Sequence, residues 1–119
     1  MCDKHPEMFV HAMPAPEAGS LERLLSELEF NVILSRSERM ASFDLIQFRR
    51  AIADGTFAWI DDDLRSAVCG AYTAMFTANA DVELYTHRHS SASGVRDSMA
   101  RCEGPIKIAI DSLRSALLS

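Results

Sequence analysis

One stretch of this sequence repeats apolar residues at helical spacing for about five turns, which limits the chain to folds built around one long helix. Its apolar face, which includes one amide, consists of Leu64, Ala67, Val68, Ala71, Tyr72, Met75, Asn79 and Val82. The spacing is that of an amphipathic α-helix. The preceding Asp61-Asp62-Asp63 favours a helix start, through a cap and the positive end of the helix dipole. At ~1.5 Å per residue, a helix from there to Thr86 or His89 is roughly 40 Å long.

A second periodic segment precedes it. Ser20 is a good N-cap residue, and Leu21, Leu24, Leu25, Leu28 and Val32 form the stripe of an amphipathic helix. Phe30, Ile33 and Leu34 widen this stripe, so we expect the helix to contact neighbours on two sides. Glu22, Glu27 and Arg23 are expected to form its charged face. We expect the helix to end near Met40 or Ala41.

A short helix is expected between these two segments. Ser42 or Asp44 can cap it, and its body contains Leu45, Ile46, Phe48, Arg49 and Ile52. Gly55 is expected just past its end, at the C′ position, where glycine tolerates the left-handed conformation. Residues 56–60, which include the aromatic residues Phe57 and Trp59, then connect it to the long helix.

The last periodic segment runs from Val95 to the C-terminus, with Met99, Cys102, Ile106, Ala109, Ile110, Leu113 and Leu117 on its apolar face. Pro105 interrupts it, because the ring clashes with the carbonyl of Arg101 and the nitrogen carries no hydrogen. We therefore expect a kink there, or a break with Pro105 in the first turn of a new helix.

No segment shows the period-2 alternation of a strand, so the predicted class is all-α. The predicted architecture is an antiparallel bundle of three long helices plus one short helix, with the last helix kinked or broken at Pro105. Residues 1–19 show no periodicity and are expected to form a flexible N-terminal arm. Residues 20–119 are expected to form a single helical-bundle domain.

Charge and composition exclude several classes of function. The formal net charge is −5, and no basic block is present, so we expect no nucleic-acid binding. The apolar runs are far shorter than the roughly 20 residues of a membrane span, so we expect no membrane segment here, and leave an upstream anchor open. Cys2, Cys69 and Cys102 are an odd number without short-range pairing, which favours a reducing, cytoplasmic location.

No residues indicate a metal, a cofactor or catalysis. Three adjacent aspartates point in three directions on a helix, so Asp61-Asp62-Asp63 is read as a helix start rather than a cation site. His87 and His89 face about 200° apart on a helix and lack a third ligand nearby. No nucleophile motif, phosphate loop or Glu-x-x-His pair occurs. An all-helical chain can be an enzyme, but no catalytic residue is indicated.

Four polar or aromatic residues have two readings. Asn31 and Asn79 lie near or on apolar stripes, and Trp59 and Tyr72 combine an aromatic body with a polar tip. As a functional site, they would line a pocket between helices. As structural residues, they would fix helix register or hold a neighbouring loop. We expect Asn79 to be largely buried and bonded to Asn31 or to the connector around Trp59.

Eight single residues along the chain form a pattern that also occurs in other proteins. The residues of this pattern are Glu27, Leu28, Asn31, Trp59, Leu64, Arg65, Tyr72 and Asn79. In this pattern the chain resembles a loosely defined group of uncharacterised prokaryotic small helical proteins. The resemblance implies an all-α fold and carries no activity, and many members of the group have a transmembrane segment before this region.

The functional expectation is a helical interaction module that self-associates as a homodimer, without catalytic activity. The first and last helices are apolar over more than one face, which a symmetric dimer would use. The alternative is a small-molecule sensor or enzyme whose pocket lies between helices near Asn31, Tyr72 and Asn79.

Overall fold

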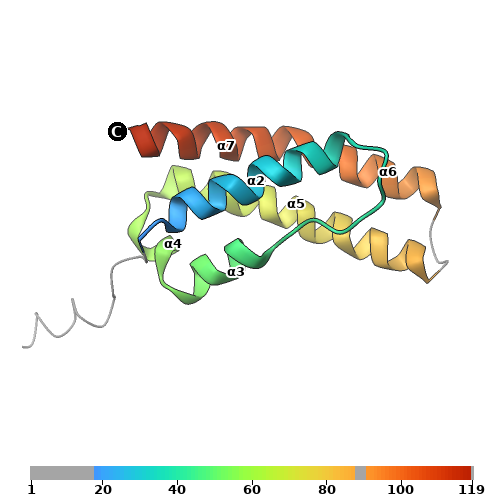
Figure 1. Cartoon of the computed structure of the whole chain (residues 1–119), viewed down its shortest axis with the longest axis horizontal. Helices are drawn as coiled ribbons and strands as arrows, with labels where there is room; N and C mark the ends of the chain where they lie inside the picture. Colours follow the sequence, from blue (N-terminus) through green and yellow to red (C-terminus); the bar gives the residue numbers. More distant parts are fainter. Residues whose placement is uncertain (1–17, 88–90, 119) are drawn as a thin grey trace, which may run out of the picture.

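The structure is a computed structural model that describes residues 18–87 and 91–118, and all of the regular structure in these two ranges is helical (Figure 1). The expected arm, residues 1–19, falls almost entirely outside these ranges. The helices are α2 (Ser20–Arg36), α3 (Ile46–Ala53), α4 (Thr56–Trp59), α5 (Asp62–Thr86), α6 (Ala92–Ala100) and α7 (Glu103–Leu118). The predicted all-α class is therefore confirmed.

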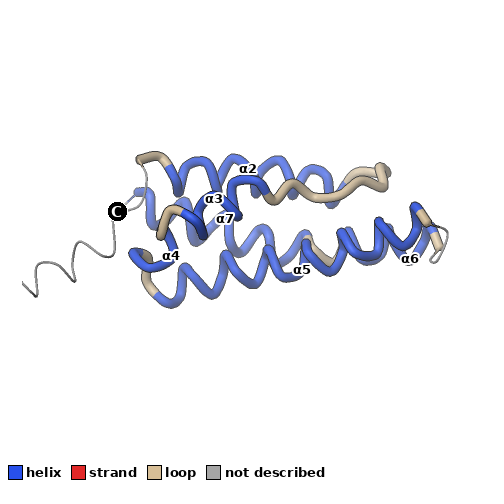
Figure 2. Tube along the Cα trace, turned by 90° about the horizontal axis from the view of Figure 1, so that it is seen from below, coloured by secondary structure: helices blue, strands red, loops and turns tan. Residues whose placement is uncertain are grey.

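Three long helices form the body of the molecule. Helix α7 packs against both α2 and α5, and α6 packs against α5 (Figures 1 and 2). Figure 1 shows that α2 and α5 run in the same direction, while α7 runs back toward the end where α2 begins. The expectation of an antiparallel bundle is therefore wrong for α2 and α5. The reason is residues 37–45, here called the return loop, which lead the chain back along α2 before α5 begins.

Helix α2 ends at Arg36, earlier than the expected Met40 or Ala41. Ser37 already has an extended backbone, with φ −83° and ψ 166°. Its backbone N–H and its hydroxyl both donate to the carbonyl of Leu34, at 3.1 and 2.9 Å. A serine that satisfies a terminal carbonyl in this way ends the helix and starts the return loop.

Individual residues mark the ends of α3 and the start of α5. The N-cap of α3 is Leu45, so neither Ser42 nor Asp44 holds the cap position that was expected of them. Asp44 still accepts a hydrogen bond from the Ile46 N–H at 3.2 Å. Gly55 lies two residues past the end of α3 with φ +83°, the left-handed conformation that was predicted. Asp61 caps α5 by accepting from the Leu64 N–H at 2.8 Å.

The last periodic segment forms two helices, α6 and α7, separated by Arg101 and Cys102. Pro105 is the third residue of α7, where its missing N–H leaves no bond of the helix unmade.

The core lies between the three long helices and beneath the return loop and α3. Its fully buried large side chains are mostly aliphatic and come chiefly from α2, α5 and α7: Leu24, Leu28, Val68, Tyr72, Met75, Ile106 and Leu113. The return loop and α3 add Phe43, Leu45, Phe48 and Ala51. Within the two described ranges, no helix has both the length and the hydrophobicity needed to cross a membrane.

Candidate functional site

Two asparagines from different helices hold the return loop. The Asn31 side chain on α2 accepts from the Asp44 N–H at 3.0 Å and donates to the Asp44 carbonyl at 2.8 Å. The Asn79 side chain on α5 does the same to Phe43, at 2.6 and 3.1 Å. An extended loop has no internal partners for its backbone groups. The two amides therefore supply the partners that this part of the loop lacks.

A buried carboxylate extends this network to α3. Glu27, only 5% exposed, accepts from the backbone N–H groups of Gln47 at 2.8 Å and Phe48 at 3.2 Å. Both amides belong to the first turn of α3, where a negative charge is favoured by the helix dipole. Burial raises the pKa of Glu27 above its usual value, outweighing the hydrogen bonds that lower it.

Tyr72 joins the same carboxylate from α5. Its hydroxyl donates to Glu27 at 2.6 Å, and its ring stacks on Phe48 with centroids 4.2 Å apart. Burial, and then the bond to Glu27, raise the pKa of Tyr72 far above its usual value, so it is a hydrogen-bond donor at neutral pH. Glu27 and Tyr72 therefore tie α2, α3 and α5 together.

The structure brings three of the four predicted site residues, Asn31, Tyr72 and Asn79, into this network. Asn79 is more buried than exposed and is hydrogen-bonded within the chain, as expected, but the expected partner is wrong: Asn79 bonds the main chain of Phe43 rather than Asn31 or the connector. The reason is that the return loop, and not the connector, passes over this part of α5. Trp59 lies apart in α4 and is 50% exposed.

Sequence reasoning misplaced Glu27 on a charged face. The available signal was its position three residues after Leu24 and four before Asn31, which puts it beside the apolar stripe of α2. The negative charge of Glu27 predicts a position on the protein surface, because an unpaired carboxylate is rarely buried. The amides of α3 that satisfy it could not be anticipated from α2.

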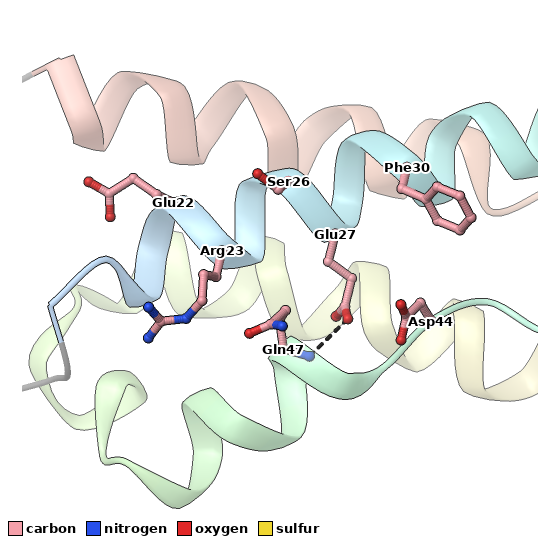
Figure 3. Close-up of a pocket in the computed structure, with 7 residues that line it drawn as sticks. All are labelled: Glu22, Arg23, Ser26, Glu27, Phe30, Asp44 and Gln47. Carbon is pink, nitrogen blue, oxygen red and sulfur yellow. Dashed lines mark hydrogen bonds between the residues drawn. The ribbon is translucent and has the colours of Figure 1, made fainter.

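A groove of about 370 Å³ opens beside this network between α2 and the segment that leads into α3 (Figure 3). It is lined by Glu22, Arg23, Ser26, Glu27, Phe30, Asp44 and Gln47. The lining therefore includes three carboxylates and one guanidinium. The side-chain oxygen of Gln47 is buried and accepts no hydrogen bond. The groove is an acidic recess with an unused hydrogen-bond acceptor.

Large apolar side chains are exposed on α2 and at the start of α3. Phe30, which lines the groove, is 57% exposed. Ile33, which lies three residues further along α2 and lines a second groove between α2 and α7, is 65% exposed. Ile46, which lies in sequence between the groove residues Asp44 and Gln47, is 64% exposed. We call Phe30, Ile33 and Ile46 the α2–α3 patch.

Two of the aspartates considered for metal binding, Asp61 and Asp62, have structural roles. Asp61 caps α5, and Asp62 pairs with Arg65 at 2.6 Å. His87 follows the last residue of α5, while His5, His11 and His89 lie outside the described residues. In the part of the chain that the structure describes, no group of three or more potential metal ligands occurs.

Comparison of the chain with protein-family models, with curated proteins and with solved structures gives no match. The resemblance to a group of prokaryotic helical proteins therefore stays a prediction.

Proposed function

We propose that this protein is a helical interaction module that self-associates as a homodimer and has no catalytic activity. The observation that carries this proposal is the α2–α3 patch, in which three large apolar side chains are each more than half exposed. Together the three side chains expose roughly 300–400 Å² of apolar surface, and the largest apolar patch on a monomer, at about 300–600 Å², is often functional. Burying this patch against a second copy removes it from water.

The polar network supports the same proposal. The amides of Asn31 and Asn79 and the hydroxyl of Tyr72 are all bonded within the chain. These groups therefore fix the return loop and α3, and with them the position of Ile46. The residues that could have bound a ligand serve instead to present a rigid surface.

A small-molecule sensor or enzyme is the second candidate function. The observation in its favour is the groove, whose volume of about 370 Å³ is in the range of ligand pockets. It touches the network through Glu27 and Asp44, close to the predicted pocket. It ranks second because the predicted pocket residues have their polar atoms occupied within the fold.

The proposed module acts in the cytoplasm, with neither nucleic acid nor membrane as a partner. Cys69 and Cys102 are both free thiols, as expected of a protein from a reducing compartment. The net charge of −5 disfavours phosphate backbones.

Sedimentation velocity on single variants tests the proposal. Ile33→Ser and Phe30→Ser remove apolar surface from the patch and are expected to weaken the dimer at micromolar concentration. Ile108→Ser on α7 is the matched control, because Ile108 is 62% exposed outside the patch. A dimer that is lost in the control and kept in the patch variants contradicts the proposed face. A wild-type monomer that is stabilised against heat by small molecules favours the second candidate.

A further inference from the structure

The groove between α2 and α3 is lined by more acidic than basic side chains. Among the described residues, no ion pair is made by Glu22 or Asp44, and Glu27 is bonded only to N–H and O–H donors. Arg23 is the single basic residue in the lining, and one of its bonds goes to the Ala18 carbonyl at 3.1 Å. The recess therefore carries a surplus of negative charge.

Another feature of the groove also suits a guanidinium group. The half-exposed ring of Phe30 lines the groove as well (Figure 3), and guanidinium groups stack on aromatic rings. Acidic and aromatic groups together favour an arginine side chain.

Arg39 is an arginine of this chain that fits. It is exposed, and within the described residues its side chain makes no hydrogen bond or ion pair. It cannot reach the Glu22 end of its own groove, because it lies beyond the C-terminal end of α2 while Glu22 lies in the first turn. The 17 residues of α2 span about 25 Å at ~1.5 Å per residue, far beyond the reach of one side chain.

Arg39 of a second copy of the chain can reach the Glu22 end of the groove, which Arg39 of the same copy cannot. Glu22 lies eight positions before Phe30, and Arg39 lies nine positions after it. Two α2 helices that cross antiparallel near Phe30 therefore bring the Arg39 end of each copy to the Glu22 end of the other. Because such a pair has two-fold symmetry, the contact is made twice. Phe30 and Ile33 then meet their counterparts at the centre.

We infer that two copies of this chain pair antiparallel through α2, with Arg39 of each copy inserted into the acidic groove of the other. The inference rests on the proposed self-association and adds its orientation and its charge pairing. The apolar centre supplies affinity, while the two arginine contacts select one orientation over others.

Charge reversal tests this pairing. Glu22→Arg and Arg39→Glu each place like charges at both contacts and are expected to raise the dimer Kd by about tenfold or more. An equimolar mixture of the two variants restores both opposite-charge contacts, as does the double variant. Glu83→Arg and Arg101→Glu, at exposed positions distant in sequence from α2, are the matched controls. Circular dichroism of each variant establishes that it is folded.

The outcomes separate this inference from the proposal on which it rests. Weakened single variants with recovery in the mixture support the arginine contacts, and so does a Kd that rises with salt. Weakened single variants without recovery overturn the pairing. Dimers as tight as wild type in every charge variant overturn the pairing but leave self-association intact. A wild-type chain that stays monomeric overturns both.

Discussion

Asn31 and Asn79 lie on two different helices and hold successive residues of the same loop. Each amide makes a two-way pair with main chain, Asn31 with Asp44 and Asn79 with Phe43. The return loop is thus fixed from α2 on one side and from α5 on the other. Since the loop leads into α3, which begins at Ile46, these two amides position part of the surface on which the proposed self-association depends.

The first prediction concerns Asn79. Replacement with Ala leaves the N–H and carbonyl of Phe43 without partners, so the free energy of unfolding should fall by about 1–3 kcal/mol. Replacement with Leu should cost a similar amount, because an apolar side chain supplies neither partner. Urea denaturation of both variants checks this, with Thr77→Ala at an exposed position of α5 as the control. A silent Asn79→Leu would show that the loop does not depend on this amide.

A second prediction uses Tyr72. Tyr72→Phe keeps the ring that stacks on Phe48 and removes only the hydroxyl that donates to Glu27. We expect a loss of about 1–3 kcal/mol in the free energy of unfolding, because the hydroxyl is buried and bonds a buried carboxylate. Tyr85→Phe, on the exposed part of α5, should change it by less than about 0.5 kcal/mol. Equal effects of the two variants would argue against the Glu27–Tyr72 bond.

Protonation of Glu27 gives a third prediction. The pKa of Glu27 in the folded chain lies above its ordinary value of 4.5, chiefly because of burial. Between these two pKa values the folded chain binds more protons than the unfolded one, so the contribution of Glu27 to stability falls as pH rises through this window. The free energy of unfolding of wild type minus that of Glu27→Gln should therefore become less positive, or more negative, from pH 4.5 upward and then level off. A value that becomes more positive as pH rises would contradict the raised pKa.

The fourth prediction is that replacement of two glycines with Ala changes the stability of the chain in opposite directions. Gly55 has φ +83°, so Gly55→Ala should destabilise the chain by about 1 kcal/mol. Gly70 lies within α5, and a Cβ there would meet nothing within 4 Å. Gly70→Ala should therefore stabilise the chain by about 0.5–1 kcal/mol through helix propensity. Thermal melts of the two variants should shift in opposite directions, and a shared direction would contradict this account.

The sequence was informative where local rules decide the structure. The periodicity predicted α5, the aspartates at its start predicted its cap, and Gly55 was placed correctly past α3. These features depend on neighbours within a few residues. The return loop has no such signal, because its conformation is set by Asn31 and Asn79 from distant parts of the chain. The shared direction of α2 and α5 follows from that loop and was missed with it.

The candidate site was predicted in part for the same reason. Asn31 and Asn79 stood out as amides among apolar residues, but their partners are main-chain groups, which any residue could supply. Glu27 did not stand out, since a carboxylate on a surface helix is ordinary. Its burial depends on Tyr72 and on the first turn of α3, and only the folded chain brings these together.

Sedimentation equilibrium of the wild-type chain at micromolar concentration tests the central claim most directly. The chain has a mass of 13.2 kDa. Self-association through the α2–α3 patch predicts a species of about twice 13.2 kDa that dissociates on dilution and is weakened by Ile33→Ser. A single species of 13.2 kDa at every concentration would contradict the account.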